Sequence, residues 1–186
     1  MHPTKEKPDI KIHDLEFELM ISEKEIRDKT NEIGRALTEK FKDNVPVLLG
    51  VLNGSFIFMA DLMRACNMPC EVSFIKLSSY SGTKSTGIVK SVIGLQTDLD
   101  GRDVIIVEDI IDSGETMHQF LPQLMDMNPS SVTIVSLLVK PTAMKYNIRI
   151  DHIGFEIPEK FVVGYGLDYN EQGRNLKDIY QLKKGG

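Results

Sequence analysis

The stretch VIIVEDIIDSGETM, residues 104–117 and named the central motif below, decides how the rest of the chain is interpreted. Its first four residues are all apolar and β-branched, which is typical of a strand covered on both faces in a parallel sheet. Glu108 and Asp109 follow at the carboxyl end of this strand, where open α/β sheets bind ligands. Because adjacent strand residues point to opposite faces, the two carboxylates could meet a ligand from two directions. Paired acceptors suit a vicinal diol such as ribose.

The next five residues, Asp112 to Thr116, predict a tight turn that leads into a helix. Gly114 allows close backbone approach, the first N–H groups of the helix lack partners, and Ser113 and Thr116 add hydroxyls. The positive end of the helix dipole attracts an anion without an obligatory lysine, and the GxxxxGK[ST] pattern of a P-loop is absent. The turn therefore suits a sugar phosphate and argues against a nucleoside triphosphatase.

An ordinary buried strand with solvated acids and a capped helix would explain any one of these residues alone. The order of apolar run, acids, glycine turn and helix start instead indicates a binding site. The whole stretch resembles the phosphoribosyl-diphosphate signature of the type I phosphoribosyltransferase family, and within it the hypoxanthine-guanine group. The resemblance implies that Asp112 accepts a proton from the base. It also implies that Glu108 and Asp109 hold the ribose, and that Ser113, Gly114, Glu115 and Thr116 hold the 5-phosphate.

Length, charge and cysteine content narrow the class of protein. The 186 residues predict one domain, residues 1–186. A net charge of -5 argues against a nucleic-acid surface, which needs clustered cations. Cys66 and Cys70 are too few and wrongly spaced for a disulfide framework or a CxxC site. The polar start and the lack of a long apolar run predict a cytoplasmic protein without a membrane span.

Strand and helix patterns alternate from residue 46 to residue 140, which predicts an α/β fold with a mainly parallel central sheet flanked by helices. The resemblance adds a small hood built from residues 1–20 and about 150–186. Ser22 and Glu25 form a capping box before an apolar helical stripe. Pro122 should kink the helix after the central motif or delay its start.

Two loops gain a role only through the resemblance. Asn53 and Gly54 end an apolar run and could be a plain connector, but the corresponding turn in the family touches pyrophosphate through its backbone. Many relatives carry lysine where this chain has Asn53. The polar loop 78–87 is longer than a connector needs, and the resemblance makes Ser79 and Tyr80 the start of a flap that closes over the reaction centre.

Residues 151–158 and 160–168 carry a second resemblance, and the family also assigns roles to Lys140 before them and Arg174 after them. Lys140 ends a buried strand and would ordinarily reach solvent, whereas the family places this lysine against the purine oxo group. Phe161 would ordinarily be core, but its family equivalent stacks on the purine and Val162 offers backbone groups to the base edge. Asp168 would sit near the metal-pyrophosphate end and Arg174 would reach the pyrophosphate. Relatives often carry an aromatic residue where this chain has Gly173.

The resemblance implies transfer of phosphoribosyl from phosphoribosyl diphosphate to a 6-oxopurine, hypoxanthine and also guanine, giving IMP or GMP and pyrophosphate. It implies Mg²⁺ held through Glu108, Asp109 and Asp168, and a homodimer or homotetramer. Scattered histidines exclude a transition-metal site. A signalling receiver domain is excluded because too few residues follow Asp109. A non-catalytic nucleotide- and RNA-binding regulator on the same fold is the remaining alternative. The sequence does not rank hypoxanthine, guanine and xanthine.

Overall fold

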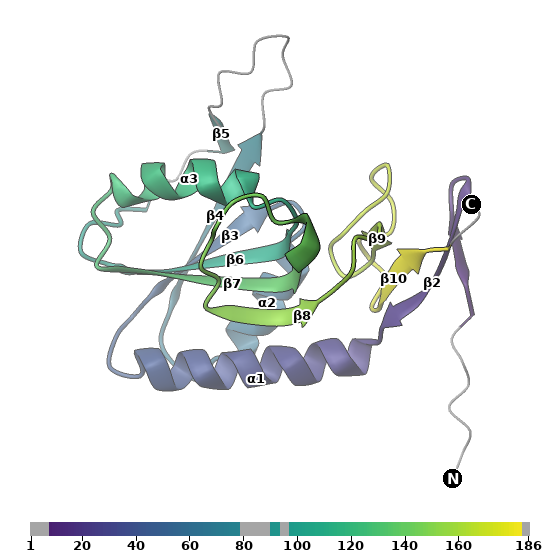
Figure 1. The fold of residues 1–186 in the computed structure, drawn as a ribbon. Coiled ribbons are helices and arrows are strands. Elements are labelled where there is room, and N and C mark those ends of the chain that lie inside the picture. Colours follow the sequence, from purple (N-terminus) through teal and green to yellow (C-terminus); the bar gives the residue numbers. More distant parts are fainter. Residues whose placement is uncertain (1–7, 79–89, 94–96, 184–186) are drawn as a thin grey trace.

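The structure, a computed structural model, describes residues 8–78, 90–93 and 97–183. These residues form a large six-stranded sheet and a separate four-stranded sheet beside it (Figure 1). The order in the large sheet is β5-β4-β3-β6-β7-β8, and all of its neighbouring pairs are parallel except β4 with β5. The predicted mainly parallel sheet is therefore confirmed. Its strands are β3 (Val47–Leu52), β4 (Glu71–Ser78), β5 (Lys90–Ile93), β6 (Asp103–Ile111), β7 (Ser131–Val139) and β8 (His152–Glu156).

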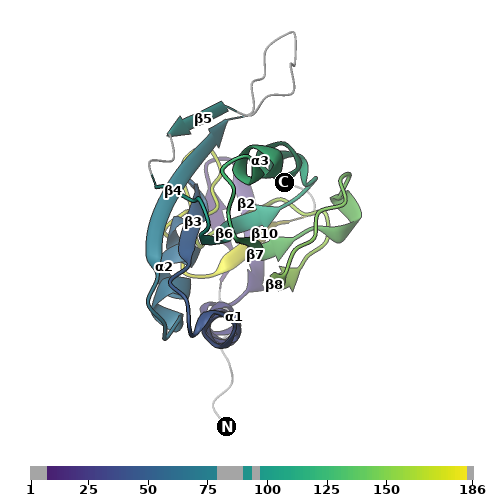
Figure 2. The ribbon, with the colours of Figure 1, turned by 90° about the vertical axis from the view of Figure 1, so that its left-hand side faces the viewer.

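Helices cover both faces of this sheet, which explains why its strands are apolar throughout. On β6, Ile105 and Val107 pack in one buried cluster with α1 (Glu23–Phe41) and α2 (Phe56–Ala65). The alternating residues Val104 and Ile106 pack in a second cluster with α3 (Glu115–Met125). Figures 1 and 2 show α3 on one side of the sheet and α1 on the other. The central motif thus begins in the middle of the core.

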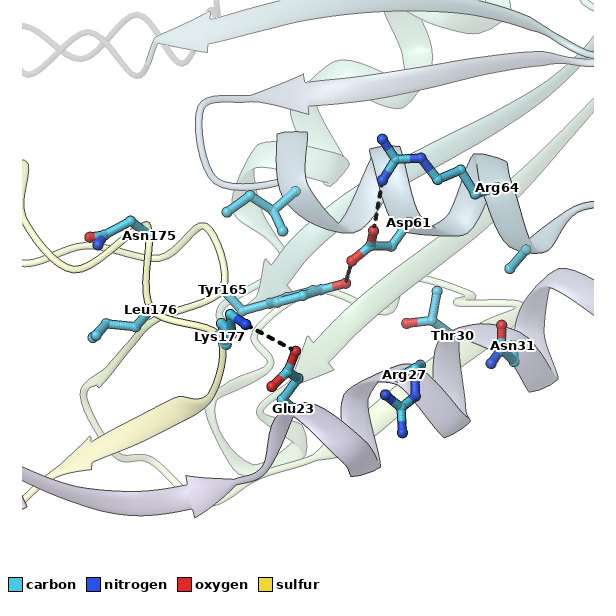
Figure 3. A pocket seen from close by; sticks show the side chains of 12 residues that line it. Glu23, Arg27, Thr30, Asn31, Asp61, Arg64, Tyr165, Asn175, Leu176 and Lys177 are labelled. Atoms are coloured by element: carbon cyan, nitrogen blue, oxygen red, sulfur yellow. Dashed lines mark hydrogen bonds and ion pairs between the residues drawn. The ribbon is translucent and has the colours of Figure 1, made fainter. Parts of the chain in front are cut away.

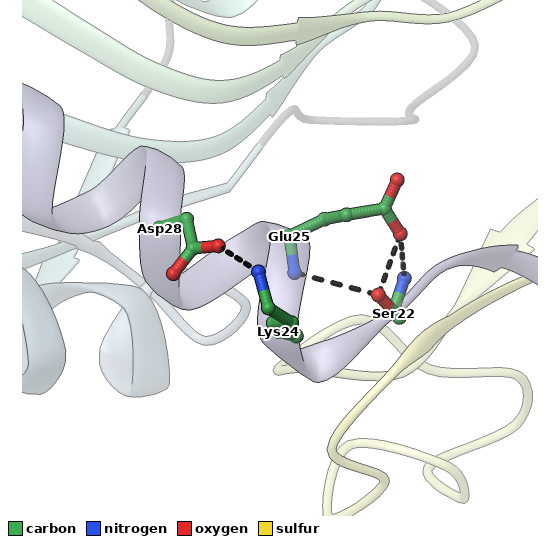
Figure 4. A network of polar contacts seen from close by, with 4 residues as sticks. All are labelled: Ser22, Lys24, Glu25 and Asp28. Atoms are coloured by element: carbon green, nitrogen blue, oxygen red, sulfur yellow. Dashed lines mark hydrogen bonds and ion pairs between the residues drawn. The ribbon is translucent and has the colours of Figure 1, made fainter. Parts of the chain in front are cut away.

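The start of α1 is fixed by the predicted capping box (Figure 4). The Ser22 N–H donates to Glu25 Oε2 at 2.9 Å, and the Glu25 N–H donates to Ser22 Oγ at 3.4 Å. Each residue satisfies a backbone donor that the helix itself leaves free. The apolar stripe that follows is buried, as expected from its helical spacing: Ile26, Ile33, Leu37 and Phe41.

The small sheet is the predicted hood, and both ends of the chain contribute to it. Its antiparallel order is β1-β2-β10-β9, and its own apolar cluster contains Phe17 and Val163. The C-terminal part of this sheet begins at β9 and not near residue 150, because β8 pairs with β7 in the large sheet. Its strands are β1 (Ile10–Ile12), β2 (Leu15–Ile21), β9 (Val162–Val163) and β10 (Ile179–Leu182).

Two further local features follow from the sequence. Pro122 lies inside α3, which already begins at Glu115, so the proline does not delay the helix. Cys66 and Cys70 are free and partly buried, and burial raises the pKa of the Cys66 thiol to about 11. None of the described helices is both long and apolar enough to span a membrane.

Candidate active site

The site lies where the large sheet opens at the carboxyl ends of two central strands. β3 pairs with β6 only as far as Gly50 and Val107, whereas β7 follows β6 to its end at Ile111. Beyond Gly50 and Val107, β3 and β6 are no longer paired. From β3 the chain continues to β4 on one side, and from β6 it continues to β7 on the other. The space between the ends of β3 and β6 is therefore a topological switch point, the usual ligand site of open α/β sheets. A cavity of about 310 Å³ opens there, lined by residues 51–54, Leu77 and residues 108–117.

Glu108 and Asp109 lie at the floor of this cavity. They were expected after the strand, but β6 continues through them to Ile111 because β7 extends its hydrogen-bond ladder that far. Glu108 is only 6% exposed. Burial, followed by the neighbouring Asp109 charge, raises the pKa of Glu108 well above its usual range, and burial also raises the pKa of Asp109. A cation or hydroxyl donor entering the cavity would stabilise the charged form of this pair.

The Asn53–Gly54 turn forms another wall of the cavity and contacts Asp109, one member of the acid pair Glu108 and Asp109. A Cβ atom on Gly54 would lie 1.5 Å from Asp109 Oδ2, so only glycine lets this carboxyl rest against the backbone. The Leu52–Asn53 peptide bond is cis. The fold thus brings the 53–54 turn against Asp109, more than fifty residues later in the sequence.

The glycine turn, residues 112–116, presents an unusually open helix start. Gly114 is the N-cap of α3, with φ of +78°, and no side chain caps the helix. Ser113 Oγ accepts only a long hydrogen bond, 3.3 Å, from the Glu115 N–H. Apart from that long bond, the first N–H groups of α3 lack the oxygen that an N-cap side chain normally supplies. Because residues 113–116 line the cavity, this is the arrangement of an anion site.

Asp112 and Lys140 meet at the edge of this turn. Lys140 Nζ donates to Asp112 Oδ2 at 2.6 Å, and the Lys140 N–H donates to the Ile111 carbonyl at 3.0 Å. The lysine side chain is 12% exposed and that of the aspartate 53%. The lysine is thus not the free, solvated strand-end residue of the simplest interpretation. The pair places a donor and an acceptor side by side.

Asp168 and Arg174 form a second pair, on the arginine loop (residues 164–176). Arg174 Nη2 lies 2.8 Å from Asp168 Oδ1, and Arg174 Nη1 donates to the Gly166 carbonyl at 2.8 Å. Burial raises the pKa of Asp109, and the positive charge of Arg174 offsets a small part of that rise. Gly173 has φ of +102° and packs against Ile12, a conformation in which an aromatic residue would be strained.

Phe161 and Val162 lie in the hood. The Phe161 ring is 45% exposed and lies 5.8 Å from the ring of Tyr169, centroid to centroid. Val162 is buried in β9 and pairs with Gln181. The Phe161 ring contacts aromatic rings of the hood, whereas the Val162 side chain packs in the large core cluster with α1 and α2, and neither residue lines the cavity. Ser79 and Tyr80, the expected start of the flap, lie outside the described residues.

Two contributors were missed from the sequence. Gly166 packs so tightly on the Gly54 carbonyl that a Cβ atom would lie 2.0 Å from that oxygen. Its position in the run Gly-Tyr-Gly, residues 164–166, was the only available signal. The segment after Lys140 also supports the glycine turn, because the Lys145 N–H donates to the Ser113 carbonyl at 2.9 Å and Met144 packs against Gly114. No local pattern marks that contact.

Comparison with known proteins assigns the class. The family model of the phosphoribosyl transferase domain matches residues 19–170, and the chain belongs to this family. Within it the chain falls among the hypoxanthine and hypoxanthine-guanine phosphoribosyltransferases. It is 45% identical over 172 residues to the hypoxanthine-guanine phosphoribosyltransferase of Bacillus subtilis (92% of this chain, 95% of the relative). It is 47% identical over 165 residues to the hypoxanthine phosphoribosyltransferase of Escherichia coli K12 (87% and 93%).

A solved structure agrees with these sequence relatives. The crystal structure of a hypoxanthine phosphoribosyltransferase from Staphylococcus aureus superposes with a TM-score of 0.85 at 38% identity, covering 89% of this chain and 91% of that one. The matches extend across both sheets of the protein and do not stop at the central motif. The family expectation drawn from residues 104–117 is therefore confirmed for the chain as a whole.

Proposed function

We propose that this protein transfers the 5-phosphoribosyl group of phosphoribosyl diphosphate to hypoxanthine, and to guanine, forming IMP or GMP and pyrophosphate in purine salvage. The observation that carries the proposal is the Asp112–Lys140 ion pair beside the open start of α3. Asp112 is an acceptor suited to the ring N–H of a 6-oxopurine, and Lys140 is a donor suited to its oxo group. Both residues lie beside the helix start that suits a sugar phosphate. The RNA-binding regulator has no such observation in its favour.

The sugar end of the substrate fits the glycine turn and the acid pair. Backbone donors of residues 113–116, with the Ser113 and Thr116 hydroxyls, would hold the 5-phosphate. Glu108 and Asp109 would accept from the ribose hydroxyls. The anomeric carbon gains positive charge as the bond to the leaving group breaks, and carboxylates held nearby in a poorly hydrated cavity stabilise that charge more than they would in water.

The base end requires a proton acceptor and a donor. Asp112 would accept the imidazole-ring proton of the purine as the new bond forms, using the oxygen that Lys140 does not occupy. Lys140 would turn toward the oxo group and donate to it. Phe161 would stack on the purine ring, which suits its half-exposed face, and Val162 would offer backbone groups to the base edge.

The leaving group requires cations and backbone donors on the opposite wall. Arg174 would contact pyrophosphate together with the backbone of Asn53 and Gly54, and Asp168 would orient that arginine at the metal-pyrophosphate end. Within the described ranges no three His, Cys, Asp or Glu side chains gather to hold a metal. Mg²⁺ is commonly bound through one or two protein carboxylates together with substrate oxygens, and the candidate carboxylates here are those of Glu108, Asp109 and Asp168. Magnesium would supply charge neutralisation for the diphosphate.

Three further parts of the proposal concern the protein in its setting. Ser79 and Tyr80 would lead a flap that excludes water from the reaction centre. A homodimer or homotetramer is supported by exposed apolar side chains on α2 and β4, among them Phe56 and Phe74. Two free cysteines suit the reducing cytoplasm. Light scattering after size-exclusion chromatography tests the assembly.

A steady-state screen tests the reaction itself. Purified protein, Mg²⁺ and phosphoribosyl diphosphate are incubated separately with hypoxanthine, guanine and xanthine, and nucleotide formation is followed by absorbance. Turnover with hypoxanthine is expected, with guanine as a second substrate. No nucleotide from any of the three bases, in a sample that is folded by circular dichroism, would contradict the proposal.

A further inference from the structure

Tyr165 occupies a constrained position between two close backbone contacts. Gly164 and Gly166, on either side of it, have φ of +103° and +104°. A Cβ atom on Gly164 would lie 2.0 Å from the Asp178 carbonyl oxygen, and one on Gly166 would lie 2.0 Å from the Gly54 carbonyl oxygen. Tyr165 itself has φ of +48°, which is uncommon for a residue with a side chain. Something must hold this tyrosine in place, since such a conformation persists only where the surroundings require it.

Tyr165 packs in the large core cluster and its N–H donates to the Leu176 carbonyl at 2.8 Å, and a further contact is a hydrogen bond from its hydroxyl to α2. The Tyr165 hydroxyl donates to Asp61 Oδ2 at 2.7 Å, and the tyrosine is only 6% exposed. Asp61 Oδ1 accepts a longer hydrogen bond, 3.4 Å, from Arg64 (Figure 3). Figure 3 shows the phenol pointing from the arginine loop toward the helix. The contact lies in the wall of a cavity of about 440 Å³ that shares no residue with the active-site cavity.

Each of the two residues in this hydrogen bond is connected to a group that the proposed function assigns to pyrophosphate binding. Asp61 is on α2, which starts two residues after Gly54. From Tyr165, the Gly166 N–H donates to the Arg174 carbonyl at 2.9 Å and the Gly166 carbonyl accepts from Arg174 Nη1 at 2.8 Å. The Tyr165–Asp61 contact therefore joins the helix that follows the Asn53–Gly54 turn to the loop that carries Asp168 and Arg174. Asp112, Lys140 and the glycine turn are held by different hydrogen bonds, among them those from Lys140 to Asp112 and from Lys145 to Ser113.

We propose that Tyr165 and Asp61 are positioning residues for the pyrophosphate side of the site, setting the distance between the 53–54 turn and Arg174 without touching substrate. The inference rests on the proposed function. Losing the hydrogen bond should loosen diphosphate binding selectively, because Lys140 and Asp112 are held by β6 and β7 and not by the arginine loop. A general loss of stability would instead affect both substrates alike.

Tyr165→Phe removes only the hydroxyl. We expect the KM for phosphoribosyl diphosphate and the Kd of magnesium pyrophosphate to rise about fivefold to tenfold, the usual effect of losing one buried hydrogen bond, with the KM for hypoxanthine within about twofold of the parent. Asp61→Ala should reproduce this pattern, and Asp61→Asn should largely restore the parent values because its amide oxygen still accepts from the phenol.

Tyr169→Phe is the matched control. It removes a tyrosine hydroxyl on the same loop, one that donates to the exposed Asp14 at 3.0 Å, and should change neither substrate's KM. Equal rises in both KM values, or parent-like pyrophosphate binding in both Tyr165→Phe and Asp61→Ala, would overturn the positioning role. If Tyr165→Phe does not fold, the Asp61→Ala and Asp61→Asn pair makes the same test from the helix. An inactive parent enzyme would contradict the proposed function, whereas pyrophosphate calorimetry tests the positioning role without turnover.

Discussion

The glycine turn lines the active-site cavity and the arginine loop packs against the 53–54 turn of that cavity, but the two regions acquire their shapes in different ways. The glycine turn comes from one continuous stretch, residues 112–116, and its open helix start follows from a glycine at the N-cap. The arginine loop is shaped by distant partners, because Gly166 packs on Gly54 and Tyr165 bonds to Asp61, each more than 100 residues earlier in the chain. One region is local in sequence, and the other exists only in the folded protein.

This difference predicts two kinds of mutational effect. Substitutions in the glycine turn should reduce catalysis or phosphate binding while leaving stability nearly unchanged, since the affected side chains are exposed or project toward the cavity. Substitutions at the tightly packed Gly166 of the arginine loop should reduce stability together with diphosphate binding. Measuring kinetics and unfolding on the same variants separates the two.

The largest effect on catalysis is expected in the glycine turn. Asp112→Asn should lower kcat by roughly 100-fold to 10,000-fold, the usual range for loss of a general base, with an unfolding midpoint close to that of the parent. Asp126→Asn, at the other end of α3, is the control for removing an exposed carboxylate and should leave kcat unchanged. Turnover of Asp112→Asn within threefold of the parent would remove the general-base role.

The largest effect on stability is expected in the arginine loop. Gly166→Ala should lower the free energy of unfolding by about 2 kcal/mol more than Gly101→Ala, because it adds a clash with the Gly54 carbonyl to the strain of a positive φ. Gly101 also has a positive φ, +66°, but a Cβ atom there meets nothing within 4 Å. Urea unfolding measures both variants. Equal losses would show that the close approach to Gly54 contributes nothing.

Lys140→Ala tests the connection between the base side and the glycine turn. It should raise the KM for hypoxanthine about tenfold or more, the range for a hydrogen bond to a charged group, and change the KM for phosphoribosyl diphosphate much less. Lys145→Ala is the matched control. It also removes a lysine charge, here an exposed one, while the backbone N–H of residue 145 still donates to the Ser113 carbonyl. Similar rises for both substrates would place Lys140 outside the base pocket.

The smallest effect is expected from a single hydroxyl. Thr116→Val should weaken binding of IMP by about 1 kcal/mol if the threonine hydroxyl meets the 5-phosphate, because the backbone donors of the turn remain. Isothermal calorimetry with IMP measures this change. Unchanged affinity would reduce Thr116 to an ordinary residue of the helix start.

The same contrast explains what could be predicted from sequence. The apolar run 104–107, the Ser22–Glu25 capping box and the glycine turn are local patterns, and the structure contains all three. The length of β6 past Glu108 was not predictable, because it depends on how far β7 extends beside it. The contact of Gly166 with Gly54 depends on how the hood packs against the large sheet. No local sequence pattern predicts that packing.

A structure of the protein with IMP and magnesium pyrophosphate tests the central claim most directly. We expect phosphate oxygens within hydrogen-bond distance of the backbone nitrogens of residues 113–116, the ribose hydroxyls on Glu108 and Asp109, and the purine oxo group within reach of Lys140 Nζ. Pyrophosphate should lie between the 53–54 turn and Arg174. A nucleotide bound in the cavity beside Tyr165, or one whose phosphate lies away from the start of α3, would contradict the account.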